Sequence, residues 1–260
     1  MFDSKWNEEA NTGEIPGTIG LRAIEGMIAV PISADKWFEG VNFEVGFWQN
    51  CLRTGGAQWP DEYRSRLDPR RPFDSKVEQA IRHTGSRGID ILDVGAGPIT
   101  SLGYVSRKFD IKITATDPLA DAYTVLLDEA GVTPPVKTGK YFGENLLQDF
   151  GGRRFHVCHS SNALDHSLDP RTILVAMARL LAPQGLLYVR VYRNEGESTR
   201  YSGMHNWNFD RDENNNFILW RAGEKYRINE ELADLVEGEV TEDGPELVFC
   251  AYRNEKRTFA

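Results

Sequence analysis

The segment 91–103, ILDVGAGPITSLG, constrains the fold most, because it has the pattern of a buried strand that runs into a glycine turn. Its short apolar run is typical of a central parallel strand. Gly95 and Gly97 lack a Cβ, so the turn can adopt positive φ angles and a ligand can lie against its backbone. We expect a helix over 98–108, whose free N–H groups would point at that ligand.

From Gly88 onward, strand-like runs alternate with helical patterns, which indicates an α/β fold with a parallel sheet and helices on both faces. Predicted strands cover 89–94, 111–117, 154–160, 186–194 and 246–254, with a weak edge strand within 132–142. Predicted helices cover 98–108, 118–131, 171–185 and 228–238. Residues 195–227 read as an irregular, aromatic segment.

The first 85 residues differ in character from the rest, being rich in Trp, Phe and Arg with few strand-like runs. Apolar spacing predicts helices within 42–56 and 71–85, the second with Ser75 and Glu78 spaced as a capping box. We therefore expect an N-terminal helical cap or lid over 1–85 and a catalytic domain over 86–260.

Three interpretations of the glycine turn compete: it holds a dinucleotide, S-adenosylmethionine, or nothing. A dinucleotide fold needs a third glycine where this chain has Thr100, and Asp93 would face the incoming pyrophosphate. The same negative charge suits the sulfonium and ammonium groups of S-adenosylmethionine. Asp117, which ends the next strand, can accept hydrogen bonds from ribose hydroxyls in either cofactor.

These segments resemble the motifs of the class I S-adenosylmethionine-dependent methyltransferases. LDVGAGPIT looks like their first motif and ATDPLA like their acidic second one; GENLLQDF, FHVCHSSNALDHSLDP and LLAPQGLLYVRV follow in the expected order over about 88–192. The resemblance implies a three-layer Rossmann-like methyltransferase fold. Its seven-stranded sheet would be mostly parallel, with an antiparallel last strand.

The resemblance also implies contacts with S-adenosylmethionine. It places Asp93, Gly95 and Gly97 along the methionine part and Asp117 on the ribose. Five residues would surround the adenine: Pro118, Leu119, Gly143, Glu144 and Asn145. Ser160, Ser161 and Asn162 would line the methyl-transfer face. The chain departs from the family pattern at Ile99, where many members have a glycine, and at Phe142, near where an acidic residue often meets the adenine.

Methyl transfer to a hydroxyl needs collinear placement of nucleophile, methyl and sulfur, and a base that takes the proton. His205, in a segment after the fifth strand where such enzymes often build the acceptor pocket, is our first candidate. His166 and His159 are the others, whereas His83 and His156 lie within predicted elements and read as structural. Each of these histidines could equally be a hydrogen-bonded loop or core residue.

A metal-assisted reaction of the catechol type would need acidic and Asn ligands after two strands. Asp165 and Asp169 are present without a convincing third ligand, so we expect no metal site. Arg64 and Arg66 could clamp an anionic group of the acceptor. Salt bridges to Asp61, Glu62 or Asp68 are the simpler interpretation.

Composition limits the partners. The net charge of −9 disfavours a nucleic-acid partner, because that binding neutralises phosphates with Lys and Arg. No apolar run approaches the ~20 residues of a membrane span, and the N-terminus lacks the pattern of a signal peptide; we expect a cytoplasmic protein with no membrane association.

The sequence thus predicts methyl transfer to a hydroxyl of a small molecule or sugar. An NAD-dependent oxidoreductase and a non-catalytic methyltransferase-like subunit are the alternatives, and the oligomeric state is not indicated.

Overall fold

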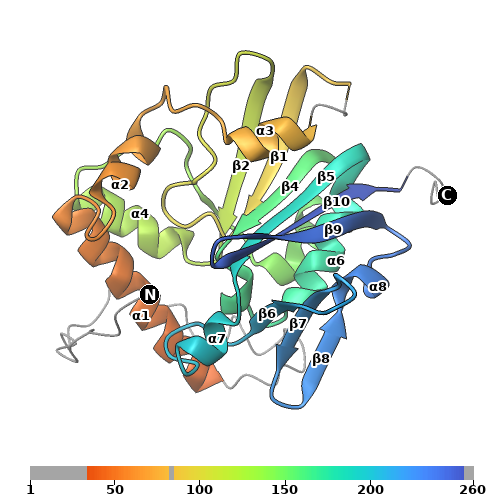
Figure 1. Ribbon diagram of the computed structural model, residues 1–260. Helices are drawn as coiled ribbons and strands as arrows, with labels where there is room; N and C mark the ends of the chain where they lie inside the picture. Colours follow the sequence, from red (N-terminus) through yellow and green to blue (C-terminus); the bar gives the residue numbers. More distant parts are fainter. Residues whose placement is uncertain (1–33, 82–84, 255–260) are drawn as a thin grey trace.

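The computed structural model describes residues 34–81 and 85–254. Its main sheet has seven strands in the order β3-β2-β1-β4-β5-β10-β9 (Figure 1). They are β1 (Gly88–Val94), β2 (Asp110–Asp117), β3 (Gly139–Lys140), β4 (Phe155–Ser161), β5 (Leu181–Tyr192), β9 (Val236–Asp243) and β10 (Glu246–Arg253). The strands from β3 to β5 pair in parallel, and β10 runs antiparallel to both neighbours. This order confirms the expected Rossmann-like methyltransferase sheet.

Helices cover both faces of this sheet, because its central strands are apolar on both sides. On one face α3 (Ser75–Ala80) packs Val77 against Ile89 and Ile91 of β1. On the other face, α5 (Leu146–Phe150) and α6 (Pro170–Leu180) pack against Leu92. The sheet and its covers form the three layers that the sequence predicted.

The N-terminal helices lie beside the sheet. The long helix α1 (Ala34–Thr54) begins before the predicted range and packs against α4 (Ala120–Glu129), with α2 (Pro60–Leu67) next to it (Figure 1). Trp37 and Leu52 of α1 share an apolar cluster with Tyr123 of α4. This cluster fixes α1 close to the point where β1 and β2 end.

The predicted helix over 98–108 is wrong. This segment is a loop that pairs with the chain before α3, where Phe73 N–H donates to the carbonyl of Val105 at 2.8 Å. Gly103 has φ +76°, and a Cβ there would come within 2.1 Å of the carbonyl oxygen of Pro72. The loop therefore makes its hydrogen bonds with a neighbouring segment, and Gly103 permits the close approach.

Other helical predictions extend too far. The helix predicted over 171–185 ends at Leu180, because Leu181 already pairs with Phe155 in the sheet. The helix predicted over 228–238 is one short turn, α8 (Ile228–Glu231), after which Val236 begins β9.

A small antiparallel sheet occupies the region that the sequence left irregular. It contains β6 (Asn208–Arg211), β7 (Phe217–Arg221) and β8 (Glu224–Arg227), and follows the short helix α7 (Glu195–Ser198). The ring of Phe217 stacks between Phe209 and Phe249, with centroid distances of 5.2 and 5.0 Å. Phe249 belongs to β10, so these rings join the small sheet to the main one.

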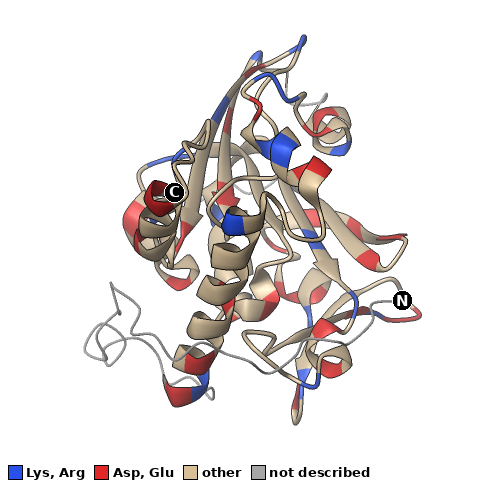
Figure 2. Cartoon of the chain, turned by 90° about the vertical axis from the view of Figure 1, so that its left-hand side faces the viewer, with Lys and Arg blue, Asp and Glu red and all other residues tan. Residues whose placement is uncertain are grey.

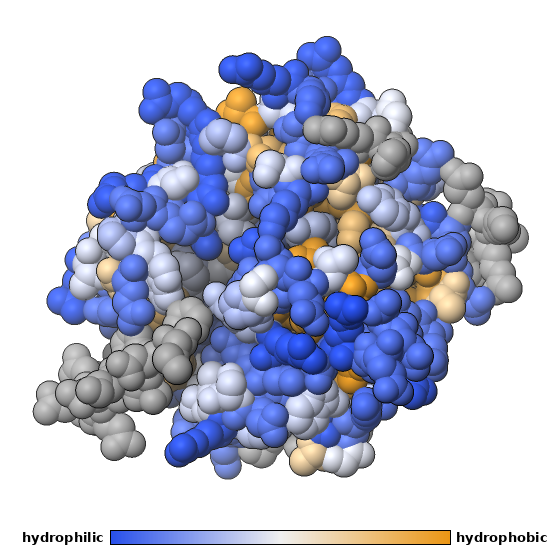
Figure 3. Space-filling view, viewed as in Figure 1, coloured by the Kyte–Doolittle hydropathy of each residue, from blue (hydrophilic) through white to orange (hydrophobic). Residues whose placement is uncertain are grey.

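The surface is mainly polar. On the face in Figure 2 acidic residues are spread over several elements, and in Figure 3 apolar colour appears only as small separate areas. In the described part of the chain, every helix is too short or too polar to cross a bilayer.

The N-terminus of α3 provides a stability test. Asp74, and not Ser75, caps this helix: its carboxylate accepts from the N–H groups of Lys76 and Val77 at 2.9 and 3.0 Å. We expect Asp74→Ala to lower the free energy of unfolding by about 1 kcal/mol. Ser75→Ala should change it by less than about 0.5 kcal/mol. Urea unfolding of both variants measures this, and equal losses would contradict the assignment of the cap.

Candidate active site

The glycine turn lies at the carboxyl end of β1, as predicted. Gly95 and Gly97 have φ angles of +71° and +63°. The N–H groups of Gly95 and Ala96 both donate to the carbonyl of Thr116, at 2.8 and 3.0 Å. Since Thr116 lies in β2, these bonds tie the turn to the end of the neighbouring strand.

Asp117 also holds this turn. Its buried carboxylate accepts from the N–H of Gly97 at 3.1 Å and from the N–H of Leu119 at 2.9 Å. Burial raises the pKa of Asp117 to about 7, against the lowering effect of these two hydrogen bonds. Asp117, the residue expected to bind the ribose, therefore lies at the carboxyl end of β2 beside the glycine turn, with a pKa near neutral pH.

Asp93 is buried, and both of its carboxylate oxygens have partners within the protein. One of its oxygens lies 2.6 Å from Nδ1 of His159, and the other accepts from the hydroxyl of Thr100 at 2.5 Å. Asp93 and His159 are both buried, and the His159 ring stacks on Tyr188 at 5.8 Å. This buried pair connects the end of β1 to β4 beneath the turn.

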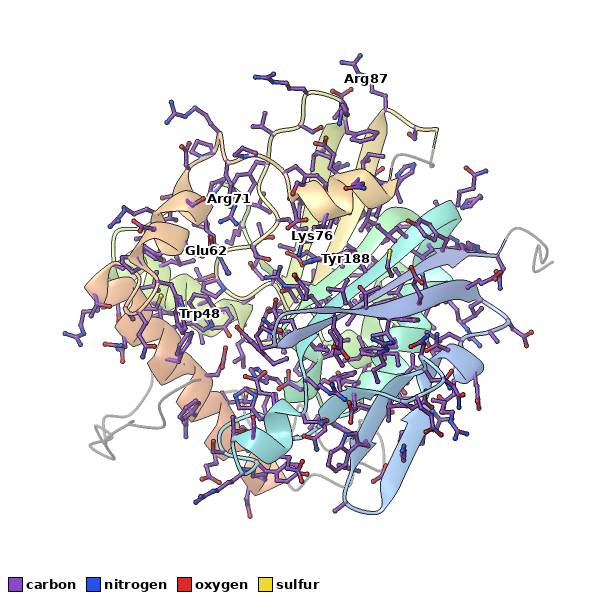
Figure 4. All side chains as sticks on the ribbon, in the orientation of Figure 1. Trp48, Glu62, Arg71, Lys76, Arg87 and Tyr188 are labelled. Atoms are coloured by element: carbon purple, nitrogen blue, oxygen red, sulfur yellow. The ribbon has the colours of Figure 1, made fainter. Side chains whose placement is uncertain are left out.

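Helix α1 covers the turn. A Cβ at Gly97 would come within 3.1 Å of the ring of Trp48, which projects from α1 (Figure 4). The Trp48 indole N–H donates to Glu44 at 2.9 Å, and its ring packs edge-on against Tyr123 at 6.3 Å. The cap thus places an aromatic ring and a carboxylate directly at the predicted cofactor position.

The residues expected near the adenine lie around the same edge. Leu119 is buried in the cluster shared with α1, and Pro118 lies beside it, half-buried. Gly143, Glu144 and Asn145 form the 3-10 turn η3 (Gly143–Asn145). One carboxylate oxygen of Glu144 accepts from the N–H groups of Leu168 and Asp169, so this side chain anchors the start of α6.

Ser160, Ser161 and Asn162 follow the fourth strand as expected. Ser160 is buried, and its hydroxyl has no hydrogen-bond partner among the described residues. Asn162 has φ +50°, and its amide donates to Glu246 at 3.0 Å. The chain then turns through Ala163. A Cβ added at Gly95 would come within 2.3 Å of the Cβ of Ala163, so Ala163 packs over this glycine.

Two of the three candidate histidines meet beyond this turn. The 3-10 turn η4 (Leu164–His166) carries Asp165 and His166, and His205 comes from the loop before β6. Nδ1 of His205 lies 2.7 Å from Oδ2 of Asp165 and 3.1 Å from Nε2 of His166. Glu44 and Glu195 lie at the margin, with oxygens 3.9 Å from His166 Nδ1 and 4.0 Å from His205 Nδ1.

The charges of this histidine cluster, defined as Asp165, His166 and His205, shift its pKa values. Burial lowers the pKa of His205, but the hydrogen bond and charge of Asp165 outweigh burial and raise it above its ordinary value. Burial raises the pKa of Asp165, but the neighbouring histidines bring it below its ordinary value. Burial together with the charge of Asp165 raises the pKa of Glu195.

The arginines expected to clamp an anionic acceptor are already paired. Arg64 pairs with Asp61, and Arg66 Nε lies 2.9 Å from Glu62. Arg71 also reaches Glu62, at 3.0 Å (Figure 4). The simpler interpretation, salt bridges within α2 and its flank, describes these side chains.

Comparison with known proteins identifies the family. A family model described as a methyltransferase domain matches residues 63–235. The chain belongs to this methyltransferase family. The motifs and the family membership agree on S-adenosylmethionine as the cofactor.

Individual relatives are distant. The chain is 24% identical over 151 residues to the O-methyltransferase cnsE of Penicillium expansum. This match covers 58% of the chain and 51% of the relative, so the chain spans about half the length of that protein.

A solved structure shares the fold. The methyltransferase in a complex with the Trm112 methyltransferase activator of Haloferax volcanii gives a TM-score of 0.52 at 13% identity, covering 83% of this chain and 98% of that one. An O-methyltransferase family protein from Burkholderia thailandensis gives 0.49 at 14% identity, covering 85% and 63%.

Sequence reasoning missed the acidic margin of this methyltransferase site. Glu44 and Trp48 come from α1, and Glu195 from α7. Glu44 and Trp48 are one helical turn apart, which brings both side chains to the same face. That spacing was the available signal, but nothing in it showed that the face would meet the glycine turn.

Crowding at the turn can be tested with two glycines of similar backbone conformation. Alanine in place of either Gly97 or Gly131 (φ +64°) should cost about 1–2 kcal/mol through the positive φ angle. Gly131 has open space around it, whereas a methyl group added at Gly97 must push the Trp48 ring aside. We expect Gly97→Ala to lower the free energy of unfolding, measured with urea, by about 1–3 kcal/mol more than Gly131→Ala does. Equal losses would show that the ring does not press on the turn.

Proposed function

We propose that the chain transfers the methyl group of S-adenosylmethionine to a hydroxyl oxygen of a small-molecule or sugar acceptor. The observation that carries this proposal is the histidine cluster, one short turn beyond the residue that packs over Gly95. The side chains of His166 and His205 are 19% and 17% exposed, so an acceptor can reach them.

The reaction needs a partner for the hydroxyl proton. The acceptor oxygen attacks the methyl carbon, the carbon–sulfur bond breaks, and its electron pair stays on sulfur to leave S-adenosylhomocysteine. A hydroxyl attacks well only as its proton departs, and the histidine cluster holds polar groups that can assist this step. His205 is central to it, because its Nδ1 contacts both other members.

The cofactor would lie between the glycine turn and the cap. Asp117 presents a carboxylate to the ribose, and the cap residues Glu44 and Trp48 close the site from above. Exclusion of water by such a cap favours methyl transfer over side reactions. We propose that residues 1–85 act as this lid and 86–260 as the catalytic domain; His83 lies outside the described residues.

The alternatives differ in what they bind. An NAD-dependent oxidoreductase would bind NADH, and the family match with Thr100 in place of a third glycine favours S-adenosylmethionine. A non-catalytic subunit would bind the cofactor without turnover. The relative's name, O-methyltransferase, supports transfer to oxygen.

His205→Ala tests the catalytic proposal. We expect turnover to fall by about 100-fold or more, because assisted proton removal contributes that much. The affinity for S-adenosylhomocysteine, measured by calorimetry, should stay within about twofold, since His205 is placed at the acceptor. His156→Asn is the control: its Nδ1 accepts from Asp90 N–H in the sheet, and an Asn side chain can replace that acceptor.

A panel of hydroxylated metabolites supplies the acceptors for this assay. Turnover of any acceptor at an undiminished rate by His205→Ala would refute the role of His205. Binding of NADH in place of S-adenosylhomocysteine would refute the proposal as a whole.

Asp117 should make cofactor binding depend on pH. Ribose hydroxyls donate to the ionised carboxylate, but below its pKa of about 7 the free protein holds a proton there. The dissociation constant for S-adenosylhomocysteine should therefore be constant above about pH 8 and rise toward about tenfold per pH unit below about 7. Asp117→Asn should bind more weakly with a flat profile. Asp121→Asn, an exposed residue of α4 paired with Lys140, should keep the wild-type profile.

A further inference from the structure

Three ligand-type atoms converge within the histidine cluster. Nδ1 of His205, Nε2 of His166 and Oδ2 of Asp165 are separated by 3.1, 2.7 and 3.6 Å. A cation bonded to each at about 2.1 Å would hold such atoms about 3.0–3.4 Å apart. The triangle already has nearly these dimensions, and one carboxylate with two imidazoles is a set that first-row transition metals bind.

Hydrogen bonds alone satisfy both contacts of His205 Nδ1 only if one hydrogen on this atom is shared between Asp165 and an unprotonated Nε2 of His166. If Nδ1 of His205 donates to Asp165, it cannot also accept from Nε2 of His166. A hydrogen on that Nε2 is then left with the Asp165 oxygen at 3.6 Å, beyond hydrogen-bond range. If instead Nδ1 accepts from His166, its lone pair faces a carboxylate oxygen at 2.7 Å. A cation between the three atoms is the alternative to that shared hydrogen, because all three atoms then contribute lone pairs.

The surroundings of Asp165 add an independent observation. Asp165 is 2% exposed, and its second oxygen, Oδ1, is buried with no hydrogen-bond partner among the described residues. A buried ionised carboxylate with an unused oxygen is costly unless a cation compensates it. Here Oδ2 of Asp165 lies 2.7 Å from Nδ1 of His205 and 3.6 Å from Nε2 of His166.

The acidic margin fits a metal site as well. Glu44 lies 3.9 Å from the ring nitrogen of His166 that points away from the triangle. Carboxylates in this position commonly orient metal-binding histidines and fix their tautomer. Glu195, 4.0 Å from Nδ1 of His205, is near enough to contact a water molecule on the ion.

We propose that Asp165, His166 and His205 bind one divalent cation of the Zn²⁺, Co²⁺ or Mn²⁺ type, leaving open positions for the acceptor oxygen. Imidazole nitrogens favour Zn²⁺ and Co²⁺ over Mg²⁺ and Ca²⁺, which prefer oxygen ligands, and the Asp165 carboxylate is a ligand that suits Mn²⁺. This proposal departs from the sequence-based expectation of no metal site. That expectation considered carboxylate and Asn ligands, and the structure pairs Asp165 with two imidazoles.

The catalytic part of this inference rests on the proposed function. The hydroxyl oxygen of the acceptor binds the ion, which lowers its pKa, and its proton leaves to solvent water. The resulting alkoxide attacks the methyl carbon, and the carbon–sulfur electron pair passes to sulfur. His205 then acts as a ligand that fixes the ion, and no free base is required.

Metal binding is measured without cofactor or acceptor. Full-length protein treated with EDTA and desalted is titrated with Co²⁺, and the visible absorption of bound Co²⁺ is recorded. We expect one ion per chain and no displacement by millimolar Mg²⁺. His166→Gln and His205→Ala should weaken binding by at least about tenfold, since loss of even an outer partner of a ligand costs that much. His156→Asn should bind as the wild type does.

Variants that fold are compared only after their thermal melting has been checked. Asp165→Asn is included as a third ligand variant, and Glu44→Gln as a positioning variant that should weaken binding while leaving stoichiometry unchanged. Failure of the wild type to bind Co²⁺ would overturn the proposal. So would equal binding by wild type, His166→Gln and His205→Ala, because the ion would then lie elsewhere.

Activity separates this inference from the proposed function. Loss of methyl transfer after EDTA treatment, restored by Mn²⁺ or Zn²⁺, supports both. Full activity of the metal-free protein overturns the catalytic role of the ion but leaves methyl transfer established. Stoichiometric Co²⁺ binding without turnover of any acceptor supports the site and counts against the proposed function.

Discussion

The carboxylate of Asp117 joins the ends of the first two strands, and the cofactor edge of the sheet depends on it. Its hydrogen bonds from Gly97 and Leu119 fix the glycine turn relative to the start of α4. On the inner side of the same turn, Asp93 is bound to Thr100 and His159. Two buried acids thus hold a backbone that has no side chains of its own for anchorage. Both oxygens of each acid are engaged: those of Asp117 accept from backbone N–H groups, and those of Asp93 contact the side chains of Thr100 and His159.

The main sheet could be predicted because its central strands are short apolar runs, buried on both faces and separated by helical patterns. Helices were harder to predict where the backbone of a segment forms hydrogen bonds with another part of the chain. The loop that contains Gly103 pairs with the chain before α3, a contact that no local pattern records. The stretch from Ile228 to Val236 has apolar spacing compatible with a helix, but the pairing of Val236 with Arg253 makes its end a strand.

The candidate site also has one part that the sequence could predict and one part that it could not. The residues predicted to bind the cofactor, around Gly95 and Asp117, lie in contiguous motifs, so the sequence could predict them together. The histidine cluster joins η4 to a residue in the segment after β5, and each histidine was weighed alone. Its distances decide its chemistry, and those depend on how the loop before β6 folds back over η4, where Asn206 N–H donates to the carbonyl of Asp165. Glu44 and Glu195 come from further elements whose positions only the packed structure provides.

The contact between Trp48 and Gly97 has a consequence for how the site works. The indole belongs to α1, while the glycine belongs to the sheet, so ligand occupancy and helix placement form one coupled equilibrium. A substitution that shifts α1 relative to α4 would move the indole at the turn and could thereby alter affinity there without touching any ligand atom. In the proposed lid, α1 would in this way influence the affinity of the site for the methyl donor.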